Sequence, residues 1–145
     1  MSGQDLIGQA KTGTGKTLGF GIPLLTQVIS PTNPEWAEFK NAGKPQGLVI
    51  VPTRELAIQV ADDLETAGKN MGARVLSLYG GKAYEPQVEA LINGVEVIAG
   101  TPGRLIDMIK QGHLDLSAIK VLVLDEGGLD DLSDVERNEI LNRTA

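Results

Sequence analysis

The fold of this chain is decided by the stretch Ala10-Lys11-Thr12-Gly13-Thr14-Gly15-Lys16-Thr17. A short strand-like run, residues 5–9, precedes it, and a helix-like run from residue 16 to about residue 29 follows it. The two glycines allow a tight turn whose backbone N–H groups can face an anion. The N-terminus of the helix adds positive potential in the same place. The stretch therefore predicts a loop that binds the phosphates of a nucleoside triphosphate.

Two side chains of this loop can bind parts of the nucleotide complex directly. Lys16 supplies a positive charge for the outer phosphates, and Thr17 offers a hydroxyl group to a magnesium ion. The usual pattern begins with glycine, where this chain has Ala10. We predict that the whole loop contacts the nucleotide, which makes cofactor-binding candidates of Ala10, Lys11, Thr12, Gly13, Thr14, Gly15, Lys16 and Thr17.

The length, apolar content, cysteine content and charge of the chain limit the classes of protein to which it can belong. The 145 residues suit a single domain, and no apolar run approaches the roughly 18–20 residues of a membrane span, so no membrane partner is expected. The absence of cysteine fits a reducing, cytoplasmic location. The net charge of −6 is uneven: residues 1–124 carry 12 acidic and 11 basic residues, and residues 125–145 carry 7 and 2. The nearly neutral body can still bind phosphates locally.

The apolar pattern predicts an α/β fold. Short apolar runs at 47–51, 75–79, 95–99 and 120–124 alternate with helix-like segments that begin near residues 54, 84 and 102. We expect the first of these helices to end at Gly72. Such alternation predicts a parallel sheet with helices on both faces, and ligands bind at the carboxyl ends of its strands. Every motif that we single out falls at that edge: 10–17, 52–54, 80–81, 101–104 and 125–126.

The acidic pair at the end of the last apolar run complements the phosphate-binding loop. Asp125 can hold the magnesium ion, through water, and Glu126 can polarise an attacking water molecule. The sequence therefore predicts Thr17 and Asp125 as metal-binding residues.

A second group of residues at the same edge suggests a longer ligand than a nucleotide. Thr101 can cap a helix whose free N–H groups, together with Arg104, would receive a phosphate. Thr53 and Arg54 repeat this arrangement at the start of an earlier helix-like segment. The glycine pair at 80–81 permits close approach of a ligand backbone. These three segments together favour an extended polyphosphate.

These motifs resemble, in order and spacing, the first RecA-like domain of the DEAD-box RNA helicases. The resemblance covers residues 4 to about 126 and rests on 10–17, on Pro-Thr-Arg-Glu-Leu-Ala at 52–57, on 80–81, on Thr-Pro-Gly-Arg at 101–104, and on Val-Leu-Asp-Glu at 123–126. It implies a RecA-like P-loop fold that binds ATP or ADP together with Mg²⁺. It further implies that the domain hydrolyses ATP with Lys16 and Glu126 as catalytic residues, and that a second RecA-like domain is its partner. It also implies sequence-independent contacts to the backbone of single-stranded or duplex RNA through Thr53, Arg54, Gly80, Gly81, Thr101, Gly103 and Arg104.

The chain also departs from the family pattern. Asp-Glu-Gly-Gly stands at 125–128 in place of Asp-Glu-Ala-Asp, and the family's Ser-Ala-Thr motif, its adenine-reading glutamine motif and its second domain are missing. We therefore expect a helicase domain over residues 1–126, followed by an atypical acidic tail with a short helix over 127–145. The chain is read as a trimmed or engineered domain, with a natural short paralogue as the alternative. The isolated chain is expected to be nearly inactive. Two outcomes are open for its assembly: a homodimer through an exposed edge or the tail, or a monomer whose tail covers that edge. The alternative is a non-catalytic nucleotide-binding remnant or scaffold.

Overall fold

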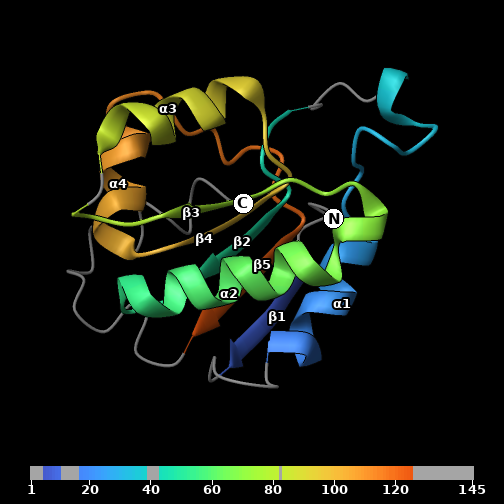
Figure 1. Cartoon of the computed structure of the whole chain (residues 1–145), viewed down its shortest axis with the longest axis horizontal. Coiled ribbons are helices and arrows are strands. Elements are labelled where there is room, and N and C mark those ends of the chain that lie inside the picture. The colour runs from blue at the N-terminus through green and yellow to red at the C-terminus, as the bar shows by residue number, and fades with distance from the viewer. Residues whose placement is uncertain (1–4, 11–16, 39–42, 82, 126–145) are drawn as a thin grey trace.

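The computed structural model describes residues 5–10, 17–38, 43–81 and 83–125, and it shows a sheet covered by helices (Figure 1). Within these residues the sheet has five strands, all parallel, in the order β1-β5-β2-β4-β3. The strands are β1 (Asp5–Ala10), β2 (Gly47–Ile50), β3 (Val75–Leu78), β4 (Val97–Gly100) and β5 (Val121–Asp125). The predicted parallel α/β fold is confirmed.

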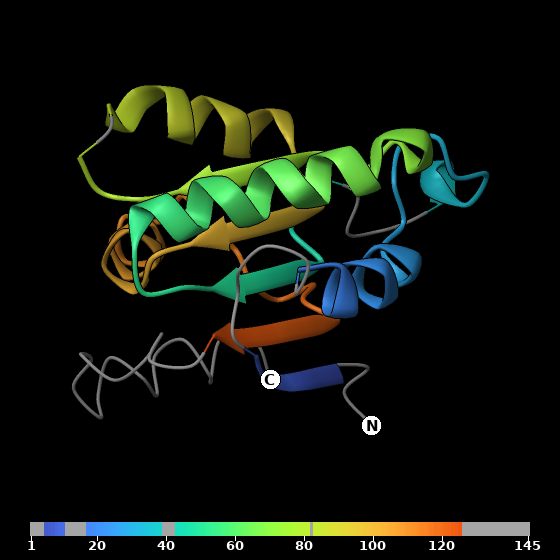
Figure 2. The ribbon, with the colours of Figure 1, turned by 60° about the horizontal axis from the view of Figure 1, so that its bottom comes forward.

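Four α-helices in the described part of the chain connect the strands. They are α1 (Thr17–Gln27), α2 (Arg54–Ala67), α3 (Tyr84–Asn93) and α4 (Pro102–Lys110), with two short 3₁₀ turns, η1 (Trp36–Glu38) and η2 (Lys69–Met71). Helices α1 and α2 lie side by side over one face of the sheet (Figure 2). Helix α4, with α3 beside it, packs on the other face. The predicted helices on both faces are therefore present.

Two apolar clusters fill the space between the sheet and these helices. Successive residues of a strand point to opposite faces, so Val49 packs under α1 and α2 whereas Leu48 and Ile50 pack under α4. The same alternation separates Val97 from Ile98 in β4. Because both faces are covered, the strands are apolar throughout, and this explains the continuous apolar runs in the sequence.

Most element boundaries lie within one or two residues of the sequence-based expectation, and two differences have a visible cause. Strand β4 begins at Val97 and not at residue 95, because the two preceding N–H groups donate to the carbonyls of Gly43 and Arg74, outside the ladder. Helix α2 ends at Ala67, before the expected end at Gly72. Gly68 closes it with an N–H bond to the Leu64 carbonyl at 2.8 Å, and η2 fills the gap to Gly72, whose φ is +73°.

A polar cluster made of Gln46, Arg74 and Glu96 lies where β2, β3 and β4 begin. Glu96 is fully buried, and its carboxylate accepts bonds from Nη2 (2.7 Å), Nε (3.1 Å) and the backbone N–H (2.7 Å) of Arg74. These bonds raise the pKa of the Arg74 guanidinium, which also lies 5.5 Å from the centre of the Trp36 ring. Buried Gln46 exchanges two hydrogen bonds with the backbone of Ile29. This polar cluster therefore anchors the loop that precedes β2.

Candidate nucleotide and nucleic-acid site

The nucleotide-binding candidates lie at the carboxyl ends of two neighbouring strands. Ala10 ends β1, Asp125 ends β5, and their Cα atoms are register partners in the parallel ladder. Thr17 begins α1, so a strand end and a helix start flank the rest of the loop. Residues 11–16, Glu126 and the predicted tail 127–145 lie outside the described residues. The structure therefore brings together Ala10 and Asp125, which are 115 positions apart in the sequence.

The candidates for the second ligand follow the other three strands. Residues 52–54 follow β2, residues 80–81 follow β3, and residues 101–104 follow β4. The sheet order places these strands next to one another, on the side of β5 away from β1. The carboxyl edge of the sheet thus has two halves: one with the nucleotide segments and one with the remaining motifs.

Thr53 and Arg54 begin helix α2. Thr53 is the N-cap residue in an extended conformation, and its hydroxyl accepts a hydrogen bond from the Leu56 N–H at 3.2 Å, as is usual for threonine at this position. Arg54 is exposed and forms a surface ion pair with Glu55, with Nε and Oε1 3.3 Å apart. Surface pairs of this kind contribute little stability, so the Arg54 guanidinium can exchange Glu55 for a ligand anion.

The glycine pair lies within reach of Arg54. Gly81 has a φ of +86°, which favours glycine, and a Cβ atom built there would lie 3.4 Å from Nη1 of Arg54. A Cβ atom on Gly80 would meet nothing within 4 Å. Gly80 is therefore not required by packing within the described residues, and its open surface would admit the backbone of a ligand.

Helix α4 begins with the Thr-Pro-Gly-Arg segment. Thr101 stands at the N-cap position, but its side chain forms no capping bond, so the predicted cap is wrong. Its N–H group instead donates to the Leu78 carbonyl at 2.9 Å, which joins the ends of β3 and β4. Gly103 is exposed, and a Cβ atom there would meet nothing within 4 Å. Like Gly80, Gly103 leaves open surface at this edge.

Arg104 is held by residues that lie outside the sequence motifs. Its Nη1 atom donates to Oε1 of Gln87 at 2.8 Å, and its guanidinium carbon lies 5.3 Å from the centre of the Tyr84 ring. Burial and the nearby Asp107 raise the pKa of Tyr84, which favours the neutral phenol. The sequence carries a weak signal for Gln87: it is a polar residue among the apolar positions Tyr84, Val88 and Leu91 of α3.

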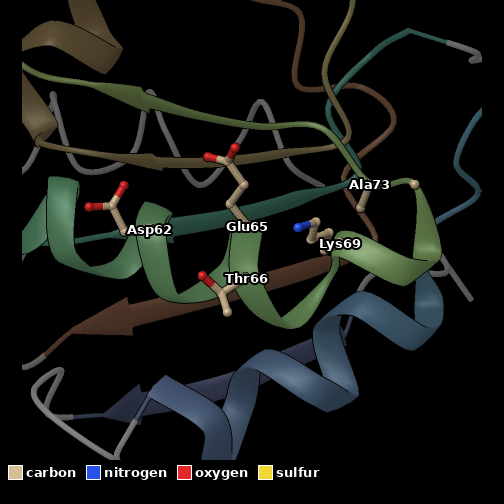
Figure 3. Close-up of a pocket in the computed structure, with 6 residues that line it drawn as sticks. Asp62, Glu65, Thr66, Lys69 and Ala73 are labelled. Carbon is tan, nitrogen blue, oxygen red and sulfur yellow. The ribbon is translucent and has the colours of Figure 1, made fainter.

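A polar hollow of about 550 Å³ lies away from these motifs (Figure 3). It is formed by the last turns of α2, by η2 and by the start of the chain segment that leads into β3. Its lining residues are Asp62, Glu65, Thr66, Lys69, Gly72 and Ala73. None of the predicted site residues contributes to it.

Within the described residues, no helix is both long and apolar enough to cross a membrane.

The site and fold together define a parallel α/β domain with its ligand candidates at the carboxyl edge, and comparison with known proteins identifies the family. The sequence profile of the family described as DEAD/DEAH box helicase matches residues 1–145. The chain is 45% identical over 127 residues to the ATP-dependent RNA helicase RhlB of Pectobacterium atrosepticum, covering 87% of this chain and 29% of that protein. It is 47% identical over 127 residues to the ATP-dependent RNA helicase DeaD of Haemophilus influenzae, covering 87% and 19%.

A solved structure agrees with this assignment. The crystal structure of a DEAD box protein from Methanococcus jannaschii matches with a TM-score of 0.77 at 36% identity, over 98% of this chain and 36% of that one. The chain belongs to the DEAD/DEAH box helicase family, and its relatives are named as ATP-dependent RNA helicases, which are ATP-hydrolysing enzymes. It spans less than a third of the length of the two relatives named above.

Proposed function

We propose that this chain is the ATP- and RNA-binding first RecA-like domain of a cytoplasmic DEAD-box RNA helicase, which couples ATP hydrolysis to remodelling of RNA duplexes. The observation that carries the proposal is the register of β1 and β5, which aligns Ala10 with Asp125. The phosphate-binding motif at 10–17 and the acidic motif at 125–126, which are proposed to act together on one nucleotide, therefore begin at neighbouring positions. A second RecA-like domain is the proposed partner for hydrolysis.

In this proposal the phosphate-binding loop holds ATP or ADP. Its backbone N–H groups and Lys16 bind the phosphates, and the Thr17 hydroxyl and the Asp125 carboxylate are the hard oxygen ligands that Mg²⁺ prefers. When bound, the magnesium ion neutralises charge on the phosphate oxygens. Glu126 orients and polarises the attacking water molecule. The pairing of Ala10 with Asp125 in the β1–β5 ladder and the start of α1 at Thr17 support these assignments.

The other half of the edge is proposed to bind the RNA sugar-phosphate backbone. Arg54 and Arg104 supply the positive charge, whereas Gly80 and Gly103 leave room for the backbone to approach the protein. Such contacts are to phosphates and sugars and would not select a sequence. The remaining contacts are assigned to Thr53, Gly81 and Thr101.

Fluorescence anisotropy with labelled RNA tests this assignment. Single-stranded RNAs of unrelated sequence should bind with similar affinities, and the variants Arg54→Ala and Arg104→Ala should weaken all of them equally and reduce the dependence on salt. Lys69→Ala, on the exposed η2 turn, is the matched control and should leave affinity unchanged. Equal RNA binding by all four proteins would reject the proposed RNA site.

Gly103→Ala is expected to change stability and RNA affinity in opposite directions. Alanine suits a helix better than glycine, and nothing in the described structure obstructs the added Cβ atom, so stability should rise by about 0.5 kcal/mol. The same methyl group would stand between the helix and an RNA phosphate, and a cost of roughly 1 kcal/mol or more for the clash lowers affinity several-fold. Thermal unfolding and RNA anisotropy measure the two effects.

Gly100→Ala is the matched control for this substitution. Its added Cβ atom would lie 2.9 Å from Cδ2 of Leu105 and 3.1 Å from the Leu78 carbonyl oxygen, which cannot move freely. We expect it to destabilise the protein by about 1–3 kcal/mol. If Gly103→Ala also destabilised the chain, or left RNA binding unchanged, the open surface at Gly103 would not be a ligand surface.

The 145-residue chain by itself is expected to hydrolyse ATP at a rate close to the background, with or without RNA. An arginine supplied from a second domain is worth roughly 10³- to 10⁵-fold in the rate of phosphoryl transfer, and residues 1–145 tested without such a domain would not receive it. A phosphate-release assay with the variant Glu126→Gln as control measures the residual rate. Strong RNA-stimulated turnover that Glu126→Gln abolishes would contradict this expectation, whereas a chain that binds no nucleotide would support the non-catalytic scaffold.

A further inference from the structure

Gln87 is a buried amide whose two polar atoms are both used. The residue lies in α3 and is only 2% exposed. Its Oε1 atom accepts the bond from Nη1 of Arg104 at 2.8 Å, and its Nε2 atom donates to the backbone carbonyl of Tyr79 at 3.3 Å. A buried amide is costly unless it is hydrogen-bonded, so these two contacts fix its orientation.

The two partners of Gln87 belong to different motifs. Tyr79 immediately precedes the glycine pair that follows β3, and Arg104 belongs to the first turn of α4. Gln87 therefore bridges two segments that follow the neighbouring strands β3 and β4 and that the proposed function assigns to the same RNA. Its hydrogen bonds fix the position of the arginine relative to the glycine pair.

The Arg104 side chain is also supported by an aromatic ring. Its guanidinium carbon lies 5.3 Å from the centre of the Tyr84 ring, a distance at which a cation is attracted to the π face. An arginine held by a hydrogen bond and a ring has lost much of its rotamer freedom before a ligand arrives. The entropy cost of ordering this side chain is then absent from the binding step.

We propose that Gln87 is a positioning residue, which orients Arg104 for its contact with an RNA phosphate and fixes its spacing from the Gly80–Gly81 turn. This inference rests on the proposed RNA-binding function and adds a residue to it that does not itself touch the ligand. A purely structural role for Gln87 would be limited to stabilising the packing of α3 on the sheet. The two roles predict different results.

The test is a double-mutant cycle on RNA affinity with Gln87→Met and Arg104→Ala. Methionine preserves the length of the side chain and removes both hydrogen bonds. Gln87→Met should weaken binding of a labelled single-stranded RNA about three- to tenfold, the effect of one newly mobile side chain. In the Arg104→Ala background, the same substitution should change affinity less than twofold.

Gln46→Met is the matched control. Gln46 is also a fully buried, hydrogen-bonded glutamine, but it belongs to the polar cluster at the opposite end of the strands. We expect this variant to lower the temperature of unfolding and to leave RNA affinity unchanged. A loss of RNA affinity in both glutamine variants, in proportion to their loss of stability, would overturn the positioning role.

A second measurement needs no RNA. NMR relaxation of the Arg104 Nε–H group should show a rigid side chain in the free wild-type protein and a mobile one in Gln87→Met. A mobile Arg104 in the free wild-type chain would overturn the proposal even if Gln87→Met failed to fold.

The outcomes separate this inference from the function on which it rests. If Arg104→Ala weakens RNA binding and Gln87→Met does not, the positioning role is wrong and the RNA contact stands. If Arg104→Ala leaves RNA binding unchanged, the RNA contact in the proposed function is wrong, and the positioning role falls with it. An equal effect of Gln87→Met in both backgrounds also overturns the positioning role.

Discussion

Replacing Lys16 with alanine is expected to lower the affinity of the chain for magnesium-bound ADP by at least about 30-fold. Truncating one partner of a closely paired charge costs roughly 2–5 kcal/mol, and each 1.4 kcal/mol is a tenfold change in affinity. Lys16 is the lysine of the predicted phosphate-binding loop, which the structure flanks with β1 and α1. Isothermal titration calorimetry measures the loss.

Two controls make this result specific. Lys69→Ala removes the same charge from η2, outside the motifs of the carboxyl edge, and should bind ADP as the wild type does. Circular dichroism should show the same helix content in all three proteins. Unchanged ADP affinity in Lys16→Ala would exclude residues 10–17 as the nucleotide site, whatever the family of the chain.

Replacing Glu96 with alanine is expected to destabilise the protein by about 3 kcal/mol, or roughly 10 °C in melting temperature. Glu96 is fully buried and accepts three hydrogen bonds from Arg74. The substitution leaves the Arg74 N–H group without its acceptor and removes the partner of a guanidinium. Because the Arg74 side chain is 38% exposed, water compensates in part, which places the cost at the lower end for a broken buried pair.

Thermal unfolding of Glu96→Ala and Glu89→Ala measures this effect. Glu89 is an exposed residue of α3, and its replacement should change the free energy of unfolding by less than about 0.5 kcal/mol. A melting temperature for Glu96→Ala within two degrees of the wild type would show that the buried pair contributes no net stability.

The class of the fold could be predicted from the sequence because the patterns that indicate each strand and helix lie within that element. The apolar runs at 47–51 and 120–124 mark buried strands whatever their neighbours are, and the start of α2 follows from the cap that Thr53 forms. The carboxyl edge as the site of the motifs follows from the direction of parallel strands. These predictions required no knowledge of which strand pairs with which.

The strand order and the polar interior could not be predicted in the same way. Nothing local to β5 shows that it lies between β1 and β2, since its neighbours are over 70 residues away in the sequence. Glu96 occurs in an apolar run as if it faced water, and its partner Arg74 is 22 positions earlier. Gln87 could not be predicted from the sequence for the same reason. Its proposed role depends on hydrogen bonds to Tyr79 and Arg104, which only the fold brings together.

The distance between the polar cluster of Gln46, Arg74 and Glu96 and the carboxyl edge has a consequence for laboratory evolution. A strand of four residues separates the two ends by about 13 Å, and substitutions this far apart usually have additive effects on stability. Libraries at the amino ends of the strands can therefore accumulate heat tolerance without altering the surface assigned to ligands. A second round of mutagenesis at the carboxyl ends can then introduce substitutions that change ligand preference but lower stability. The stabilised variant would still fold with these substitutions, whereas the original protein would not.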